Sequence, residues 1–325
     1  MGGDQAPAAV VAGALQAARR RDVAVVLVGP AQLIREQIDA LGGAGDMPVS
    51  IVDAPQAVGM EESALTAHRR KPGSSVRVAV GLVARGGADA IFSAGHTGAT
   101  FLAARAAFGL LPGVLRPALA VTVPTKAGAA ILLDAGANMD CEPDHFAQFA
   151  LMGAAYARVA LHVDRPKVGL LSIGEEAGKG NDLIREAHAR LQALPIDFIG
   201  NLEAREFFSG RADVIVCDGF TGNIALKVGE GLVEAGEDML REELGAELVS
   251  QIGGLLTRRA FARFKQRVDY AATGGAPLLG LDHLVLVGHG RSSPQAIESG
   301  IATAARLVDE RMMHGLTEAL AGRAS

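Results

Sequence analysis

Short aliphatic runs alternate with longer amphipathic stretches along almost the whole chain. The aliphatic runs predict buried strands at Val23–Val28, Val49–Val52, Ala88–Phe92, Ala118–Val123, Ala129–Leu133, Val168–Ile173, Ile196–Ile199, Ala212–Cys217 and Leu284–Val287. Apolar residues at helical spacing predict helices between them, for example at Ala8–Arg20, Val76–Ala84, Thr97–Leu110, His145–Ala160, Asp182–Ala193 and Pro294–Arg311. This alternation predicts an α/β fold built on a doubly wound, mostly parallel sheet.

Two regions depart from the alternation. Between Gly222 and Tyr270 the pattern is helical throughout, is interrupted at Gly253-Gly254 and contains no strand signal. We predict a projecting helical hairpin, residues 222–270, with Leu255 and Leu256 near its tip, inside a single domain that spans residues 1–325. The opening residues Gly2-Gly3-Asp4 resemble the loop after a strand, so the pattern favours a further strand ahead of Met1.

Composition narrows the function. The chain is 49% hydrophobic with 41 glycines and no tryptophan, so its core must consist largely of Ala, Val, Leu and Ile. A net charge of −5 argues against nucleic-acid binding, which needs a basic surface. The two cysteines form no metal-binding or disulfide pattern, and there is no signal peptide and no apolar run of the roughly 20 residues that span a bilayer. We therefore expect a soluble cytoplasmic enzyme without a metal or another cofactor.

Five glycine-rich loops directly follow predicted strands, at Ser93–Gly98, Asp134–Asn138, Gly174–Asp182, Asp218–Asn223 and Gly288–Pro294. Open α/β sheets bind ligands outside the carboxyl ends of their strands. Glycines let backbone N–H groups approach an anion, and the helix N-termini that follow favour negative charge. Together the loops predict a site for a phosphate-like anion.

The first and last of these loops carry hydroxyl and cationic side chains. Gly95 and Gly98 offer backbone amides, and Ser93 and Thr97 offer hydroxyl donors. A tight turn with a helix N-cap explains the same residues equally well. In the last loop, Arg291 can add a positive charge to the ligand site.

Carboxylate, amide and hydroxyl groups mark the second and fourth loops. Asp134 and Asn138 can orient a ligand or a neighbouring loop, although an Asx-type turn is a competing explanation for Asp134. Thr221, Gly222 and Asn223 can donate to an oxyanion at a helix start. Equally, Asn223 can simply cap that helix.

The third loop resembles a P-loop but fails its spacing. The pattern is Gly-x3-Gly-Lys instead of Gly-x4-Gly-Lys, and Gly180 stands where a Ser or Thr would bind magnesium. Nucleotide hydrolysis is therefore disfavoured. Lys179, set between two glycines at a strand end, is still suited to an anion, and Asn181 is a further candidate phosphate ligand.

Eight motifs in this order resemble those of the PlsX-type phosphate acyltransferases of bacterial phospholipid synthesis. They are MGGDQAP (Met1–Pro7), RRKPGSS (Arg69–Ser75), SAGHTGA (Ser93–Ala99), RPALA (Arg116–Ala120), LLDAGAN (Leu132–Asn138), LLSIGEEAGKGND (Leu170–Asp182), ADVIVCDGFTGNIALK (Ala212–Lys227) and GGAPLLGLD (Gly274–Asp282). The resemblance covers nearly the whole chain. Two positions differ from the usual family motifs: His96 replaces an Asn, and Gln5 replaces a His.

This resemblance implies a reversible transfer of a long-chain acyl group from acyl-[acyl carrier protein] to inorganic phosphate. The product, an acyl phosphate, would serve a downstream glycerol-3-phosphate acyltransferase in phospholipid synthesis. The resemblance also implies a fold like that of phosphotransacetylase and isocitrate dehydrogenase, a homodimer, and a strand ahead of the MGG motif.

Attack of phosphate on a thioester needs a phosphate site and donors to the tetrahedral oxyanion. Backbone amides at 95–98 and 221–223 suit the phosphate. We expect Lys179 and Asn223 to bind the oxyanion, where loss of one donor typically costs about 10²–10³-fold in rate. His96 either donates to phosphate when protonated or replaces an amide donor. Because no cysteine or serine shows a triad, we expect direct attack without an acyl-enzyme.

The second half of the predicted hairpin is basic. Thr257–Arg267 carries five basic residues and no acidic one, while Phe261, Phe264 and Val268 share a helical face. A docking surface for acidic carrier protein or for an anionic membrane fits this pattern, and so does a solvated basic face whose apolar side packs in a dimer. The candidate contact residues are Leu255, Leu256, Arg258, Arg259, Phe261, Arg263 and Phe264. The family resemblance implies peripheral contact of the cytoplasmic enzyme with a membrane through this hairpin.

Other functions are compatible with parts of the sequence. A short-chain phosphotransacylase would use coenzyme A, and the acyl donor that supports phosphate-dependent thiol release distinguishes it. A non-catalytic membrane-bound scaffold would not need so many anion-binding loops. Neither a Gly-x-Ser-x-Gly elbow nor a Gly-x-Gly-x-x-Gly fingerprint is present, which argues against serine hydrolases and dinucleotide enzymes.

Overall fold

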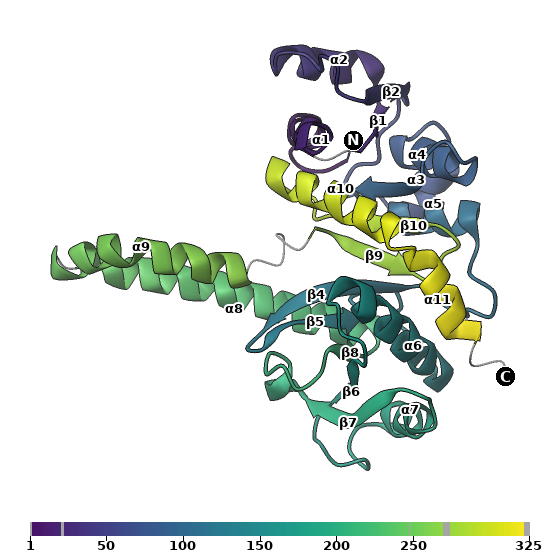
Figure 1. Ribbon diagram of the computed structural model, residues 1–325, viewed down its shortest axis with the longest axis vertical. Coiled ribbons are helices and arrows are strands. Elements are labelled where there is room, and N and C mark those ends of the chain that lie inside the picture. The colour runs from purple at the N-terminus through teal and green to yellow at the C-terminus, as the bar shows by residue number, and fades with distance from the viewer. Residues whose placement is uncertain (1, 21–22, 247, 269–273, 322–325) are drawn as a thin grey trace.

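The computed structural model of the chain describes residues 2–20, 23–246, 248–268 and 274–321 (Figure 1). At positions 246, 248, 249, 251, 252 and 266 it describes the backbone alone. The end of the predicted hairpin, Tyr270, lies outside the described residues.

Eight strands form the central sheet, in the order β3-β10-β9-β4-β5-β8-β6-β7. Strand β4 is antiparallel to both β5 and β9, and β9 is antiparallel to β10, while the other neighbours are parallel. The bounds are β3 (Ala90–Ser93), β4 (Ala118–Thr125), β5 (Gly128–Leu133), β6 (Lys167–Ser172), β7 (Asp197–Glu203), β8 (Val214–Val216), β9 (Ala276–Leu279) and β10 (Leu284–Val287). The predicted α/β fold with a mostly parallel sheet is confirmed.

Strand β9 is the element that the sequence pattern does not predict. It is only four residues long, contains Pro277 and is flanked by Gly275 and Gly280. Proline and glycine normally argue against a strand, because proline cannot donate to the ladder. It is antiparallel to both β10 and β4, so these two neighbours run in the same direction.

Helices cover both faces of the sheet (Figure 1). The most buried is α6 (Pro143–Ala160), where Phe146 and Phe149 are fully enclosed and alanines allow close packing on β5, β6 and β8. A capping box between Glu142 and His145 starts it. The other helices of the α/β body are α1 (Ala8–Arg20), α2 (Ala31–Ala40), α3 (Ala64–Arg70), α4 (Ser75–Ala84), α5 (Thr97–Phe108), α7 (Asp182–Gln192), α10 (Pro294–Asp309) and α11 (Met312–Ala321).

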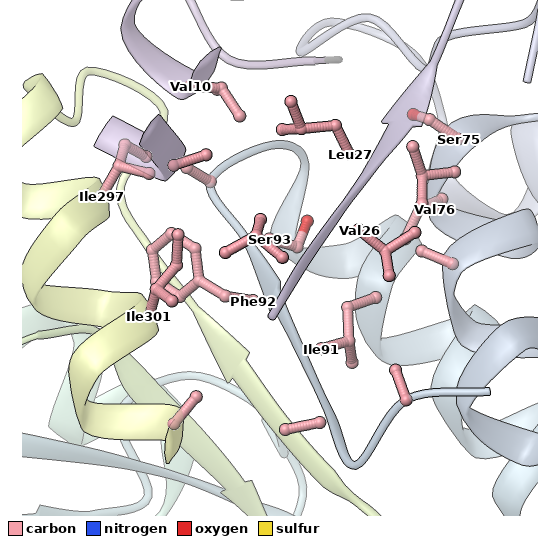
Figure 2. A pocket seen from close by; sticks show the side chains of 18 of the residues that line it. Val10, Val26, Leu27, Ser75, Val76, Ile91, Phe92, Ser93, Ile297 and Ile301 are labelled. Carbon is pink, nitrogen blue, oxygen red and sulfur yellow. The ribbon is translucent and has the colours of Figure 1, made fainter. Parts of the chain in front are cut away.

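A second, smaller sheet consists of β1 (Val25–Gly29) and β2 (Val49–Asp53), which are parallel. Helices α1 and α2 pack on it, and α1 also packs extensively on α10. Within the described residues, no ladder joins this small sheet to the central sheet. Side chains from both sheets, among them Val26, Leu27, Ile91 and Phe92, border a cavity of about 470 Å³ (Figure 2).

Two long helices, α8 (Gly219–Ala246) and α9 (Leu248–Val268), lie side by side and project from the body (Figure 1). Lys265 Nζ pairs with Glu237 Oε2 across them at 2.8 Å. The expected break at Gly253-Gly254 is wrong, because α9 runs through both glycines and α8 ends seven residues earlier at Ala246. Packing of α9 on α8 outweighs the helix penalty of about 1 kcal/mol per glycine.

Candidate functional site

The five glycine-rich loops fall into two clusters. Strand β10 neighbours β3, while β8 lies between β5 and β6. We call residues 2–4, 93–98 and 288–294 the His96 loop cluster, and residues 134–138, 174–182 and 218–223 the Asp134 loop cluster. Three antiparallel pairings separate β10 from β5, so the strands leading into the two clusters run in opposite directions within the sheet. The five loops, which together predict one anion site, therefore do not all lie at the same edge of the sheet.

Asp134 is the buried hub of the Asp134 loop cluster. Its Oδ1 accepts the backbone N–H groups of Leu119, Gly136 and Ala137 at 3.0, 3.2 and 2.9 Å. Its Oδ2 accepts the backbone and side-chain N–H groups of Asn138 at 2.7 and 2.8 Å. Burial raises the pKa of Asp134, and these hydrogen bonds oppose that shift. Because the residue is 0% exposed, Asp134 holds a loop and does not reach a ligand.

Loops 134–138 and 218–223 pack backbone against backbone. The N–H of Gly219 donates to the carbonyl of Asn138 at 2.7 Å. A Cβ added at Gly222 would lie 1.9 Å from the carbonyl oxygen of Asp134, far inside van der Waals contact. Gly222, predicted as a phosphate contact, thus provides the close approach of two loops.

Asp218 caps α8 and occupies donors that the sequence assigns to an anion. Its Oδ1 accepts the N–H of Thr221 and its Oδ2 accepts the Thr221 hydroxyl, both at 2.8 Å. The N–H of Gly222 donates to the Asp218 carbonyl at 2.9 Å. Asn223 lies inside α8, so the alternative in which it caps that helix is wrong.

Two polar side chains of the Asp134 loop cluster, those of Lys179 and Asn223, have no hydrogen-bond or ion-pair partner among the described residues. Lys179 is exposed, and its aliphatic stem packs on Gly174, where an added Cβ would lie 3.0 Å from Lys179 Cγ. Asn223 is half-buried beside Gly136, with its Cβ 3.6 Å from the Cβ position of that glycine. Both side chains can turn their donors toward a ligand without breaking an internal bond.

Asn201, a buried residue of β7, fastens the loop that carries Lys179. Asn201 Nδ2 donates to the Glu176 carbonyl at 2.8 Å, and the same oxygen accepts the Lys179 N–H at 2.9 Å. His188 Nδ1 lies 2.9 Å from Asn201 Oδ1 and donates to it. Sequence reasoning overlooks Asn201, because the aliphatic signal for β7 ends at Ile199.

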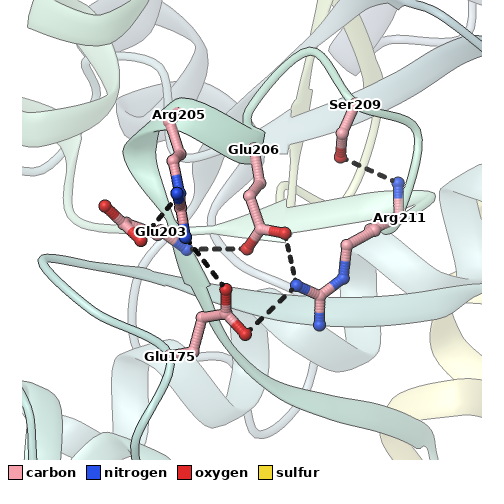
Figure 3. Close-up of polar contacts among 6 residues, drawn as sticks. All are labelled: Glu175, Glu203, Arg205, Glu206, Ser209 and Arg211. Atoms are coloured by element: carbon pink, nitrogen blue, oxygen red, sulfur yellow. Dashed lines mark hydrogen bonds and ion pairs between the residues drawn. The ribbon is translucent and has the colours of Figure 1, made fainter.

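A surface network of ion pairs joins the same loop to the segment after β7 (Figure 3). Glu175 lies 3.5 Å from both Arg205 and Arg211. Arg205 also pairs with Glu203 at 3.0 Å, and Arg211 pairs with Glu206, which lowers the pKa of that carboxyl. Exposed pairs of this kind contribute little to stability, so the hydrogen bonds of the buried Asn201 hold the loop more strongly.

Asn181 is the N-cap of α7. Its Oδ1 accepts the N–H of Ile184 at 3.0 Å, while Arg185 donates to the Gly180 carbonyl at 2.7 Å. The oxygen of Asn181 is therefore committed to the helix start, and a phosphate contact would have to use its Nδ2.

Charge around the Asp134 loop cluster is mixed. Burial raises the pKa of Cys141 to about 12, and the nearby charges of Asp134 and Asp218 add to the shift. The positive charge of Arg116 lowers the Cys141 pKa, so this exposed arginine lies near the cluster. The sequence pattern alone assigns Arg116 no role. Burial also raises the pKa of Cys217. Both thiols are therefore protonated at neutral pH, and neither is an activated nucleophile.

In the His96 loop cluster, the side chains of His96 and Ser93 are engaged by neighbouring groups. His96 is the N-cap of α5: its Nδ1 accepts the N–H of Ala99 at 3.3 Å, and its Nε2 donates to the Glu62 carbonyl at 2.9 Å. Ser93 Oγ lies 3.0 Å from Thr100 Oγ1. An Asn at this position would cap the helix in the same way. Both ring nitrogens of His96 are therefore engaged within the protein.

The remaining donors of the His96 loop cluster include Arg291, which is exposed before α10, and groups at the start of α5. Thr97 is exposed as the first residue of that helix. Gly95 packs on the N-terminal segment, where its Cβ position is 3.5 Å from Gly2 Cα, and the Asp4 N–H donates to the Gly290 carbonyl at 2.9 Å. The N-terminal segment thus belongs to this cluster.

On the hairpin, the candidate contact residues are largely exposed. Leu256 is 78% exposed, and Leu255, Phe264 and the three arginines at 258, 259 and 263 are also exposed, whereas Phe261 is half-buried. Across the described ranges, no helix combines the length and apolarity needed to cross a bilayer, and no three His, Cys, Asp or Glu side chains gather as a metal site would require.

Comparison with known proteins identifies relatives of this chain. The chain matches the family described as fatty acid synthesis protein over residues 1–314. The phosphate acyltransferase of Acidobacterium capsulatum is 48% identical over 305 residues, which cover 94% of this chain and 90% of that protein. The phosphate acyltransferase of Citrifermentans bemidjiense is 47% identical over 328 residues, which cover 100% of this chain and 93% of that protein.

Solved structures share the fold at lower identity. The EutD phosphotransacetylase from Staphylococcus aureus has a TM-score of 0.59 at 18% identity and covers 91% of this chain and 90% of its own. A phosphotransacetylase from Streptococcus pyogenes gives the same TM-score and identity over 92% and 91%. This likeness confirms the predicted phosphotransacetylase-like fold. The sequence identities establish more than the fold: the chain belongs to the phosphate acyltransferase family and is an acyltransferase that acts on phosphate.

Proposed function

We propose that this enzyme transfers a long-chain acyl group from the thioester of acyl carrier protein to inorganic phosphate, and that the Asp134 loop cluster is its active site. One observation carries the location: Lys179 and Asn223 have no partner in the described part of the chain, yet both are held in place. Lys179 stands on a loop that the buried Asn201 fastens, and Asn223 stands in α8 beside the loop that Asp134 holds. Pre-organised donors of this kind are what a developing oxyanion requires.

In the proposed reaction, a phosphate oxygen attacks the thioester carbonyl carbon. The Lys179 ammonium and the Asn223 amide donate to the tetrahedral oxyanion. Its collapse breaks the C–S bond, and the thiolate of the carrier leaves with the electron pair and takes a proton from solvent. Arg116 supplies positive charge for the phosphate dianion, which offsets the nearby carboxylate of Asp218.

The raised thiol pKa values support direct attack without an acyl-enzyme. A cysteine nucleophile acts as its thiolate, which is scarce at neutral pH when the pKa of Cys141 is about 12. Incubation with acyl carrier protein thioester in the absence of phosphate tests this directly. Formation of a stable acyl-enzyme would contradict direct attack.

The acyl donor is tested by competition between thioesters. Palmitoyl-acyl carrier protein with phosphate is expected to give palmitoyl phosphate at a rate that acetyl-coenzyme A does not approach. The product would feed a glycerol-3-phosphate acyltransferase in phospholipid synthesis. Faster turnover of acetyl-coenzyme A would instead make the enzyme a short-chain phosphotransacylase.

We further propose that α8 carries a homodimer interface. Its exposed face presents an apolar stripe at every fourth residue, which an isolated solvated helix does not need: Phe220, Ile224, Val228 and Leu232. A second copy of the same chain would cover it. Leu232→Glu is expected to convert the dimer to a monomer in analytical ultracentrifugation, whereas Leu33→Glu on α2 is expected to leave it intact.

On α9, exposed leucines beside arginines favour peripheral contact with an anionic membrane. The paired substitutions Leu255→Ser and Leu256→Ser are expected to release the protein from vesicles that contain phosphatidylglycerol while sparing activity in solution. Unchanged vesicle binding would count against membrane contact through these two leucines.

A further inference from the structure

His188, a half-buried residue of α7, is held by two residues of β7. Its Nδ1 lies 2.9 Å from Asn201 Oδ1. Its ring also meets the ring of Phe198 edge to face, with the centroids 5.1 Å apart and 70° between the planes. The sequence pattern assigns His188 no role, and no step of the proposed reaction uses it.

Both contacts depend on an irregularity in β7. Phe198 and Asn201 are three residues apart, and residues an odd number apart in a regular strand point to opposite faces. The register with β6 shifts between them, because Val168 lies opposite Phe198 but Leu170 lies opposite Asn201. Strand β7 therefore contains one extra residue, which is a β-bulge, and Phe198 and Asn201 both reach α7.

Gly200 stands at this bulge. Its φ of +89° lies in the left-handed region that favours glycine. The nearest atom to a Cβ added there would be His188 Cε1 at 3.9 Å, so the backbone conformation requires glycine and the available space does not. Bulges are rare in parallel pairs and can re-aim a side chain next to an active site. Here the bulge turns Asn201 toward α7 and the loop before it.

The hydrogen bonds admit one orientation of the Asn201 amide. The Glu176 carbonyl can only accept, so Asn201 Nδ2 faces it, at 2.8 Å. Asn201 Oδ1 then faces His188, whose Nδ1 must carry the proton that it donates. The N–H of Lys179 donates to the same Glu176 carbonyl at 2.9 Å. The orientation that His188 imposes on Asn201 is thus passed on to the backbone of Lys179.

We propose that His188 is a positioning residue of this enzyme, which acts through Asn201 to hold Lys179 at the reacting thioester. The inference rests on the proposed function, in which Lys179 donates to the oxyanion. His188 itself touches neither phosphate nor thioester. A displacement of about 1 Å can cost about 100-fold in rate, so a residue that fixes the loop can matter to the reaction without contact with a substrate.

The test removes the donor and then restores it. His188→Leu keeps an apolar contact for Phe198 but cannot donate to Asn201. We expect about tenfold lower kcat, little change in KM for phosphate, and at least about fivefold faster amide hydrogen exchange at Lys179. His188→Asn, whose Nδ2 can donate in place of the ring nitrogen, is expected to stay within about twofold of the parent in all three measurements. His314→Leu on α11 is the control for loss of an exposed histidine and is expected to change none of them.

Three results would overturn the proposal. One is unchanged kcat and amide exchange in His188→Leu, and another is an equal loss in His188→Leu and His188→Asn, which would show that the ring matters and its donor does not. The third is a further tenfold loss of kcat when His188→Leu is added to Lys179→Gln, because a residue that acts through Lys179 has little left to position there. Full activity in Lys179→Gln alone would instead contradict the proposed function, and amide exchange in the His188 variants would still test the hold on the loop.

Discussion

The two loop clusters have similar glycine-rich sequences and differ in what their side chains are free to do. In the Asp134 loop cluster, one buried carboxylate accepts the loop amides, and Lys179 and Asn223 keep their donors available. In the His96 loop cluster, His96 and Ser93 are engaged with neighbours in the same region. Glycine content alone therefore indicates close packing of backbone. The better candidate for the active site is the cluster in which side-chain donors without a partner stand on a backbone that hydrogen bonds hold in place.

The largest effect is expected from breaking the frame of the Asp134 loop cluster. In Gly222→Ala the new Cβ would lie 1.9 Å from the Asp134 carbonyl oxygen, so α8 and the Asp134 loop must separate. We expect a loss of unfolding free energy of about 3 kcal/mol, measured by urea denaturation, and at least about 100-fold lower kcat/KM for phosphate.

Gly231→Ala is the matched control in the same helix. No atom lies within 4 Å of its added Cβ, so the change is expected to be neutral or to stabilise the helix by up to about 1 kcal/mol. Normal activity in Gly222→Ala would show that the two loops need not touch.

The next effect concerns an available donor. Lys179→Gln is expected to lower kcat by about 10²–10³-fold with little change in Tm, because Lys179 is exposed and has no ion-pair partner in the described ranges. Lys126→Gln, an exposed lysine in the β4–β5 turn, is the control for charge alone. Thr97→Val removes the exposed hydroxyl of the His96 loop cluster and is expected to cost less than about tenfold. A larger loss in Thr97→Val than in Lys179→Gln would reverse the assignment of the two clusters.

The sequence predicts the repeating α/β body well because its signals are local. Helix α1 has the predicted bounds, Ala8–Arg20, and the aliphatic runs give the buried strands of the central sheet. Strand β9 escapes prediction because proline and glycine surround its few apolar residues, and its pairing depends on β4 and β10 far away in sequence. The separation into two clusters follows from the antiparallel pairing of β4 with β5, because the two antiparallel pairings of β9 cancel.

Side-chain roles are harder to predict, because they depend on which hydrogen-bond donors are already engaged by other groups within the folded protein. Thr221 and Asn223 stand two residues apart, yet Asp218 takes the donors of Thr221 and leaves the amide of Asn223 without a partner in the described chain. The sequence contains Asp218 but not the geometry that directs its carboxylate. Likewise, Asn201 acts on Lys179 through a backbone carbonyl that no motif reveals.

Asn201→Ala tests whether the hydrogen bonds of this buried residue position the Lys179 loop. It removes one of the two donors to the Glu176 carbonyl and leaves His188 Nδ1 without its acceptor, so we expect about tenfold lower kcat and about 1–3 kcal/mol lower stability. In the Lys179→Gln background the same change is expected to have little further effect on kcat, which a purely structural role would not predict. Arg205→Ala, which removes part of the exposed network, is the control and is expected to change kcat by less than about twofold.

A smaller effect is expected from substitution of His96, which stands where the family motif usually has Asn. His96→Asn keeps a side-chain acceptor for the Ala99 N–H, so stability and the pH dependence of kcat/KM should match the parent enzyme. His96→Ala loses the cap and is expected to cost about 1 kcal/mol of unfolding free energy. A pH profile that changes in His96→Asn would give the imidazole a titrating role and restore the His96 loop cluster as a catalytic element.

The smallest effect is expected at Cys141, beside the Asp134 loop cluster. Burial raises its thiol pKa to about 12, so deprotonation, and with it alkylation, becomes significant only as the pH approaches that value. We expect negligible reaction with iodoacetamide at pH 8 in the folded protein, rapid reaction after unfolding in urea, and unchanged kcat/KM in Cys141→Ser. Fast alkylation that phosphate or the acyl thioester blocks would make the thiol a nucleophile. Lys179 and Asn223 would then stabilise the formation of an acyl-enzyme at Cys141. The two clusters would differ because only the Asp134 loop cluster carries a covalent nucleophile.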